Sequence, residues 1–106
     1  MVTATSEVDL TNAGSLRDAL LSALNAGALG LVVDMTATTF LDSAGVTALV
    51  RASRRAAATG AALRLAVTSA PVLRVLNLVG IDQLIEVYPS VSDAVASLPE
   101  HRTEPA

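Results

Sequence analysis

The sequence predicts a single α/β domain, in which about four strands form a mainly parallel or mixed sheet covered by about four helices. Two observations lead to this fold class. Short apolar segments typical of strands alternate with longer segments whose apolar residues recur at helical spacing. The chain of 106 residues is also 52% hydrophobic, which suffices for one aliphatic core. We therefore expect one domain over residues 1–99 and a flexible tail over residues 100–106.

Four segments are expected to be strands. Residues 1–8 alternate between small inward-facing and polar outward-facing side chains. Residues 29–35 form a continuous apolar run, which is typical of a central strand covered on both faces. Residues 63–67 and 84–88 are the third and fourth expected strands.

Four segments are expected to be helices, because their apolar residues recur about every 3.6 residues. Each begins at a polar side chain that can accept a hydrogen bond from the first helical turn, and three of them end at glycine. They run from Thr11 or Asn12 to Gly27, from Ser43 to Gly60, from Ser69 to Gly80, and from Ser90 to Leu98.

The second helix is expected to have an apolar face and a basic face. On a helical projection, the expected core residues are Val46, Leu49, Val50, Ser53 and Ala57. The opposite side carries Arg51, Arg54 and Arg55, with Ala44 and Ala48 beside them. This basic face is either solvated or a contact surface for a partner.

The stretch from Phe40 to Gly45 joins a strand to this helix and holds the main candidate site. Ser43 is a suitable N-cap, and a helix start also favours negative charge, so Ser43 either only caps the helix or carries a phosphate. Gly45 in the first turn costs up to about 1 kcal/mol of helix propensity relative to alanine. That cost makes sense if another group must approach the backbone beside Ser43.

Composition argues against several functional classes. The net charge of −3 gives no electrostatic footprint for nucleic acid, and all seven basic residues are arginine. The absence of cysteine excludes disulfides and thiol chemistry. No apolar run approaches the roughly 20 residues that span a bilayer, and the first residues lack the basic and apolar regions of a signal peptide. We expect a cytoplasmic protein without membrane association.

Catalytic residues are scarce. The sole histidine, His101, lies in the expected tail, and Leu41 replaces the first glycine of a G-x-S-x-G nucleophile motif around Ser43. The chain has no phosphate-binding glycine motif. An enzyme or nucleotide-binding domain would have to use Asp9, Asp34 and Asp42, which lie near the carboxyl ends of expected strands or beside Ser43. Asp34 and Asp42 with water are only a weak candidate for a magnesium site.

Four stretches of the chain resemble one known family. They are Glu7-Val8-Asp9-Leu10, Leu31-Val32-Val33-Asp34-Met35, Phe40-Leu41-Asp42-Ser43-Ala44-Gly45, and the helix from Val72 to Ile81. Together they resemble the STAS domain of bacterial anti-sigma factor antagonists, in which the third stretch is the phosphoacceptor motif. The chain departs from that family at Ser6, where relatives have glycine. Relatives also usually carry about ten more residues, which form a strand before the first of these stretches. We expect either that the natural start lies earlier or that a sheet edge is left open to pairing with another chain.

The resemblance implies a regulatory role without cofactor or catalysis. An unphosphorylated antagonist binds an anti-sigma factor that has serine kinase activity, and phosphorylation of Ser43 releases it. A PP2C-type phosphatase restores the binding form. The expected partner-binding residues are Asp9, Asp34, Asp42, Ser43, Ala44, Gly45, Thr47, Ala48, Arg51 and Arg55. The alternative is a STAS subunit of a transporter or multiprotein scaffold that is not phosphorylated.

Overall fold

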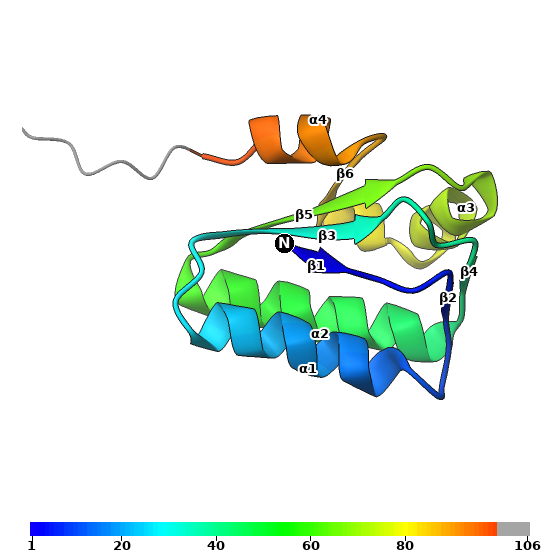
Figure 1. The fold of residues 1–106 in the computed structure, drawn as a ribbon, viewed down its shortest axis with the longest axis horizontal. Helices are drawn as coiled ribbons and strands as arrows, with labels where there is room; N and C mark the ends of the chain where they lie inside the picture. Colours follow the sequence, from blue (N-terminus) through cyan, green and yellow to red (C-terminus); the bar gives the residue numbers. More distant parts are fainter. Residues whose placement is uncertain (100–106) are drawn as a thin grey trace, which may run out of the picture.

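The computed structural model describes residues 1–99 as a layered α/β fold, with helices on both faces of a sheet (Figure 1). The main sheet has four strands: β1 (Val2–Thr3), β3 (Gly30–Met35), β5 (Ala62–Val67) and β6 (Glu86–Tyr88). They are parallel and stand in the order β1-β3-β5-β6, which confirms the expected fold class. The expected tail and His101 lie outside the described residues.

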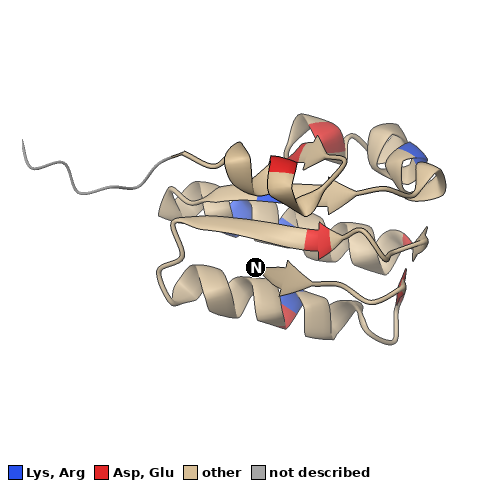
Figure 2. Ribbon diagram, turned by 45° about the horizontal axis from the view of Figure 1, so that its top comes forward, with Lys and Arg blue, Asp and Glu red and all other residues tan. Residues whose placement is uncertain are grey.

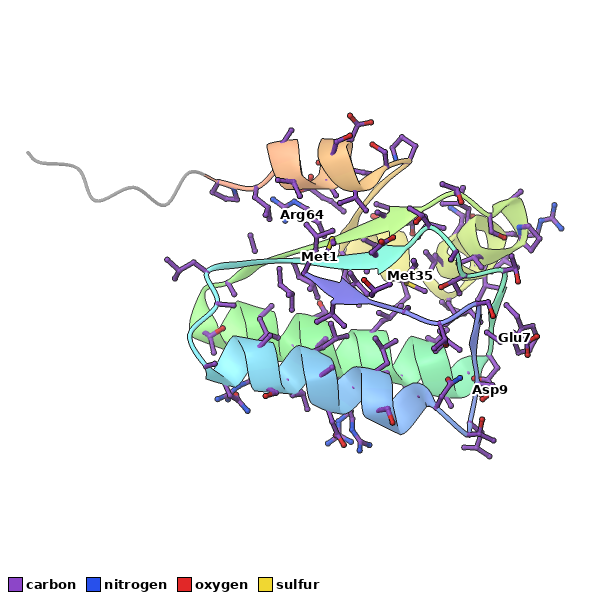
Figure 3. All side chains as sticks on the ribbon, in the orientation of Figure 1. Met1, Glu7, Asp9, Met35 and Arg64 are labelled. Atoms are coloured by element: carbon purple, nitrogen blue, oxygen red, sulfur yellow. The ribbon has the colours of Figure 1, made fainter. Side chains whose placement is uncertain are left out.

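The two faces of the sheet bury different side chains. Val33 and Leu65 are paired in register and belong to the large core beneath the helices α1 (Ala13–Asn25) and α2 (Ser43–Thr59). Val32 lies on the other face and packs in a smaller cluster with α4 (Val91–Ala96). Figure 3 shows the same division, with Met35 on the side of α1 and α2 and Arg64 on the side of α4.

The start of the chain forms two strands rather than the single strand expected over residues 1–8. After β1 the chain leaves the main sheet, and β2 (Glu7–Val8) pairs in parallel with β4 (Phe40–Leu41). The separation is fixed by backbone bonds, from Ala4 N to Asp34 O at 2.9 Å and from Thr39 N to Ser6 O at 2.8 Å. The outcome is a small second sheet directly before α2.

Local signals placed most helix ends correctly. Ser69 and Ser90 cap α3 (Ala70–Val79) and α4 as expected, and Gly60 and Gly80 end α2 and α3 in the left-handed conformation. The expected side-chain cap at the start of α1 was wrong: Asn12 occupies the N-cap position but its side chain does not bond to the helix. A short 3-10 turn, η1 (Ile81–Gln83), separates α3 from β6.

The expected core face of α2 was partly wrong. Leu49 is buried, but Ala57 is exposed and Ser53 is only half-buried. The buried residues of α2 are Gly45, Ala48, Leu49, Ala52 and Ala56. The face is rotated because α2 packs against α1 as well as the sheet, and its small side chains permit that close helix pairing.

Candidate functional site

The residue that caps α2 is Asp42, not Ser43. Its backbone is extended, and its Oδ1 accepts hydrogen bonds from Ala44 N at 2.9 Å and Gly45 N at 3.2 Å. Ser43 is the first helical residue. The expected N-cap role of Ser43 was therefore wrong, because the neighbouring carboxylate satisfies these two donors.

The side chain of Ser43 is exposed at the start of α2. Its carbonyl accepts a hydrogen bond from Thr47 Oγ1 at 2.9 Å, one turn further along. Since Asp42 provides the cap, the Ser43 hydroxyl is available for chemistry from solvent.

Gly45 is buried against the small β2–β4 sheet. A Cβ at this position would lie 2.3 Å from Leu41 Cδ1 and 2.9 Å from Val8 Cγ1. Glycine is needed because α2 begins in direct contact with these two side chains. The close approach to this backbone is therefore made by the protein's own core, through Leu41 and Val8.

Asp42 also connects the loop after β2 to the helix. Its Oδ2 accepts from Leu10 N at 3.1 Å, and its own N–H donates to Val8 O at 3.1 Å. The connection holds Leu10 near the start of α2, although its side chain is 82% exposed. Phe40, on the strand that leads into α2, is 50% exposed. The exposed apolar side chains of Leu10 and Phe40 therefore belong to the segments that adjoin Ser43.

Asp9 stabilises its own turn. Its Oδ1 accepts from Thr11 Oγ1 at 2.6 Å and from Thr11 N at 2.9 Å, while Asp9 N donates to Asn12 Oδ1 at 2.9 Å. The bond from the Thr11 hydroxyl, followed by backbone bonds, lowers the pKa of the Asp9 carboxyl below its ordinary value. Asp9 precedes Leu10, so its loop is tied to Asp42.

Asp34 is separated from the other expected site residues. Its neighbours Val33 and Met35 face the core under α1 and α2, so strand alternation directs Asp34 to the opposite face. Its Oδ1 accepts from Thr36 N at 3.0 Å and Thr36 Oγ1 at 2.6 Å. Within residues 1–99, no group of three acidic, histidine or cysteine residues is arranged to hold a metal ion.

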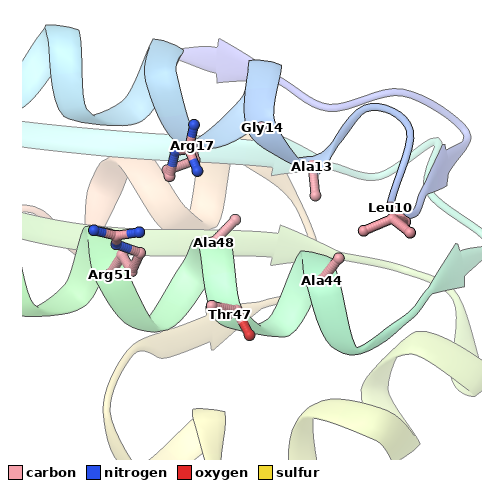
Figure 4. A pocket seen from close by; sticks show the side chains of 8 residues that line it. All are labelled: Leu10, Ala13, Gly14, Arg17, Ala44, Thr47, Ala48 and Arg51. Atoms are coloured by element: carbon pink, nitrogen blue, oxygen red, sulfur yellow. The ribbon is translucent and has the colours of Figure 1, made fainter.

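A groove runs between α1 and α2 from the start of α2 (Figure 4). Its volume is about 310 Å³, and its lining residues are Leu10, Ala13, Gly14, Arg17, Ala44, Thr47, Ala48 and Arg51. Four of these were expected site residues on α2. The wall formed by Leu10 and α1 was missed, because no local pattern in the sequence reveals which helix packs beside α2.

The remaining expected residue, Arg55, lies further along the two helices. Its Nε donates to Asn25 Oδ1 at 2.7 Å, which joins the end of α1 to α2. Arg55 lines a second hollow with Leu21, Arg51, Arg54 and Ala58. The structure thus arranges the arginines of α2 along its junction with α1.

Comparison with known families identifies the fold's relatives. The model of the STAS domain matches residues 1–94, so the chain belongs to the STAS domain family. The search among curated proteins gave no match. Among the residues that the structure describes, no helix is long and apolar enough to cross a membrane.

Solved structures of the same fold come from several bacteria. An anti-sigma factor antagonist from Mycobacterium paratuberculosis is 22% identical with a TM-score of 0.83, covering 92% of this chain and 83% of that one. A proposed anti-sigma factor antagonist from Thermotoga maritima is 20% identical with a TM-score of 0.81, covering 90% and 83%. An anti-sigma factor antagonist (STAS) domain protein from Planctomyces limnophilus is 19% identical with a TM-score of 0.78, covering 89% and 81%.

Proposed function

We propose that this STAS domain is a bacterial, cytoplasmic anti-sigma factor antagonist that works by partner switching. Without phosphate it binds an anti-sigma factor with serine kinase activity, and phosphorylation of Ser43 releases it. A PP2C-type phosphatase regenerates the binding form. In this scheme the protein is a ligand and a substrate and performs no catalysis. The similarity to antagonists from other bacteria supports the role.

The observation that carries the proposal is the exposed hydroxyl of Ser43 beside a helix cap that is already formed. A kinase can reach this hydroxyl without breaking the cap, because Asp42 holds the N–H groups of Ala44 and Gly45. Phosphorylation therefore need not unfold the start of α2.

A phosphate on Ser43 would act through its charge. It adds about −1.5 to −2 charges at pH 7, directly beside the carboxylate of Asp42. Two donors of the first turn are already bonded to that carboxylate. Arg51 is two turns away, roughly 12 Å along the helix axis, so it cannot cover the phosphate. A partner that fits the neutral hydroxyl would then meet an uncompensated dianion.

Phosphorylation by a candidate anti-sigma factor kinase tests the proposal. The full chain is incubated with the kinase and ATP, and its intact mass is measured with and without subsequent PP2C-type phosphatase. We expect a single phosphate that is absent from Ser43→Ala and removed by the phosphatase. The same kinase without ATP should bind the unmodified chain in a pull-down. A chain that binds no kinase and gains no phosphate would contradict the proposal.

A further inference from the structure

The groove between α1 and α2 has an apolar part and a basic part. Leu10, Ala13 and Ala44 line the end near Ser43, whereas Arg17 from α1 and Arg51 from α2 lie at the other end (Figure 4). The helix residues that line the apolar part, Ala13 and Ala44, have small side chains. This surface can therefore admit a backbone closely and then present two guanidinium groups to it.

The charge along these helices is opposite to that of the whole protein. The chain has a net charge of −3, yet α2 carries Arg51, Arg54 and Arg55 and no acidic residue. On α1 the one acidic residue is Asp18, which bonds to Arg17 at 3.0 Å. In Figure 2, arginines are blue and acidic residues are red on the ribbon. The junction of α1 and α2 is a basic strip on an acidic protein.

The two arginines of the groove favour a carboxylate as their ligand. Arg51 and Arg17 repel each other across the groove, and an anion between them would remove that repulsion. The planar guanidinium fork matches the two oxygens of a carboxylate better than it matches a single acceptor. Asp18 pairs with only some of the N–H donors of Arg17, because the guanidinium contacts a single oxygen of an exposed carboxylate.

We propose that this groove binds an acidic amphipathic helix of the partner protein, an inference that rests on the proposed function for the partner's identity. An apolar side chain of that helix packs against Leu10 and Ala44. A glutamate or aspartate about one or two turns further along binds between Arg17 and Arg51. Arg17 and Leu10 are thus partner-binding residues, and the basic end of the groove fixes the direction in which the partner helix docks.

The inference is tested with a synthetic peptide as the probe. The peptide is about 15 residues long, the length at which an isolated helix begins to be stable, and carries leucine and glutamate four residues apart on one face. The isotope-labelled full chain is titrated with it and followed by NMR. We expect the largest amide shifts at Ala44, Thr47 and Ala48. An otherwise identical peptide with lysine in place of glutamate should bind at least about tenfold more weakly.

Charge-reversed variants locate the binding site. Arg17→Glu combined with Arg51→Glu should lower the affinity for the glutamate peptide at least about tenfold. The matched control is Arg54→Glu combined with Arg74→Glu, which makes the same total charge change at two exposed arginines outside this groove and should cost less than about threefold. Circular dichroism and thermal unfolding of each variant ensure that only folded proteins are compared.

Three results would overturn the inference: equal binding of the two peptides, shifts confined to another surface, or full affinity in the double variant. The outcome is separate from that of the kinase experiment. If the kinase neither binds nor phosphorylates the chain while the peptide occupies the groove, the proposed function fails and the acidic ligand class stands. If the kinase phosphorylates Ser43 but the peptide does not bind, the proposed function stands and the inference about the groove fails.

Discussion

Leu10 N donates a hydrogen bond to Asp42 Oδ2 at 3.1 Å, while Asp42 Oδ1 accepts from the first turn of α2. A single carboxylate thus fixes the loop after β2 relative to the start of the helix. This bond joins residues that are 32 positions apart in the sequence. It explains why Leu10 lies at the groove and why Ser43 is free of a structural role in capping.

Removing this carboxylate should destabilise the domain. We expect Asp42→Ala to lower the free energy of unfolding by roughly 1–2 kcal/mol, because it removes the helix cap and leaves Leu10 N without its partner. Asp42→Asn should lose less, since asparagine is also a good N-cap but provides only one acceptor oxygen. Urea denaturation monitored by circular dichroism measures both changes.

Ser43→Ala is the control for this cap. We expect a change within about 0.5 kcal/mol, because the Ser43 side chain is exposed and does not cap the helix. A loss as large as that of Asp42→Ala would mean that Ser43 also supports the helix start.

Much of the fold follows from local patterns in the sequence. The strand over residues 30–35 is recognisable from its continuous apolar run, and Gly60 and Gly80 mark helix ends because they adopt positive φ. Ser69 and Ser90 are capping residues followed by helical periodicity. These features depend on neighbouring residues alone, and local reasoning finds them.

The features that were missed depend on contacts between distant segments. Asp42 and Ser43 are both residue types that cap helices well. The bonds from Asp42 N to Val8 O and from Leu10 N to the Asp42 carboxylate place Asp42 at the cap. The alanines of α2 leave its apolar face broad, so its orientation depends on α1. The motif from Phe40 to Gly45 was recognisable in the sequence, whereas the second wall of the groove required the three-dimensional structure.

The two glycines near the groove should respond oppositely to alanine. Gly45→Ala should destabilise the protein by roughly 1–3 kcal/mol, because the new methyl group would overlap Leu41 and Val8 and outweigh the gain in helix propensity. Gly14→Ala should stabilise it by about 0.5–1 kcal/mol. At position 14 the nearest atom to an added Cβ is Arg17 NH2, at an ordinary contact distance of 3.7 Å.

Thermal and urea unfolding of the two alanine variants provide the measurement. Because both substitutions add one methyl group to a helix, the difference between them isolates the packing of α2 on the small sheet. Equal stability changes would argue against close contact of Gly45 with Leu41 and Val8.

A negative charge at Ser43 should weaken partner binding without unfolding the domain. Under the proposed function, a phosphate that costs about 3 kcal/mol lowers affinity roughly 150-fold. Ser43→Asp carries less charge, and we expect a loss of at least about tenfold, with an unfolding free energy within about 0.5 kcal/mol of wild type. Ser43→Ala should bind as wild type and should no longer be released when ATP is added. Calorimetric titration with the anti-sigma factor measures the affinities, and equal binding by both variants would locate the switch elsewhere.

The turn at Asp9 should contribute stability that depends on pH. The Thr11 hydroxyl bond lowers the pKa of Asp9 below its ordinary value of 3.8, so folding favours the ionised carboxylate. The contribution is therefore complete above the unfolded pKa and disappears as the pH falls through the lower folded pKa. We expect Thr11→Val to raise the pKa of Asp9 in a carbon-detected NMR titration and to reduce the stability lost on acidification. Thr11→Ser keeps the hydroxyl and should titrate like wild type, whereas an unchanged Asp9 titration in Thr11→Val would show that the backbone N–H groups alone set the shift.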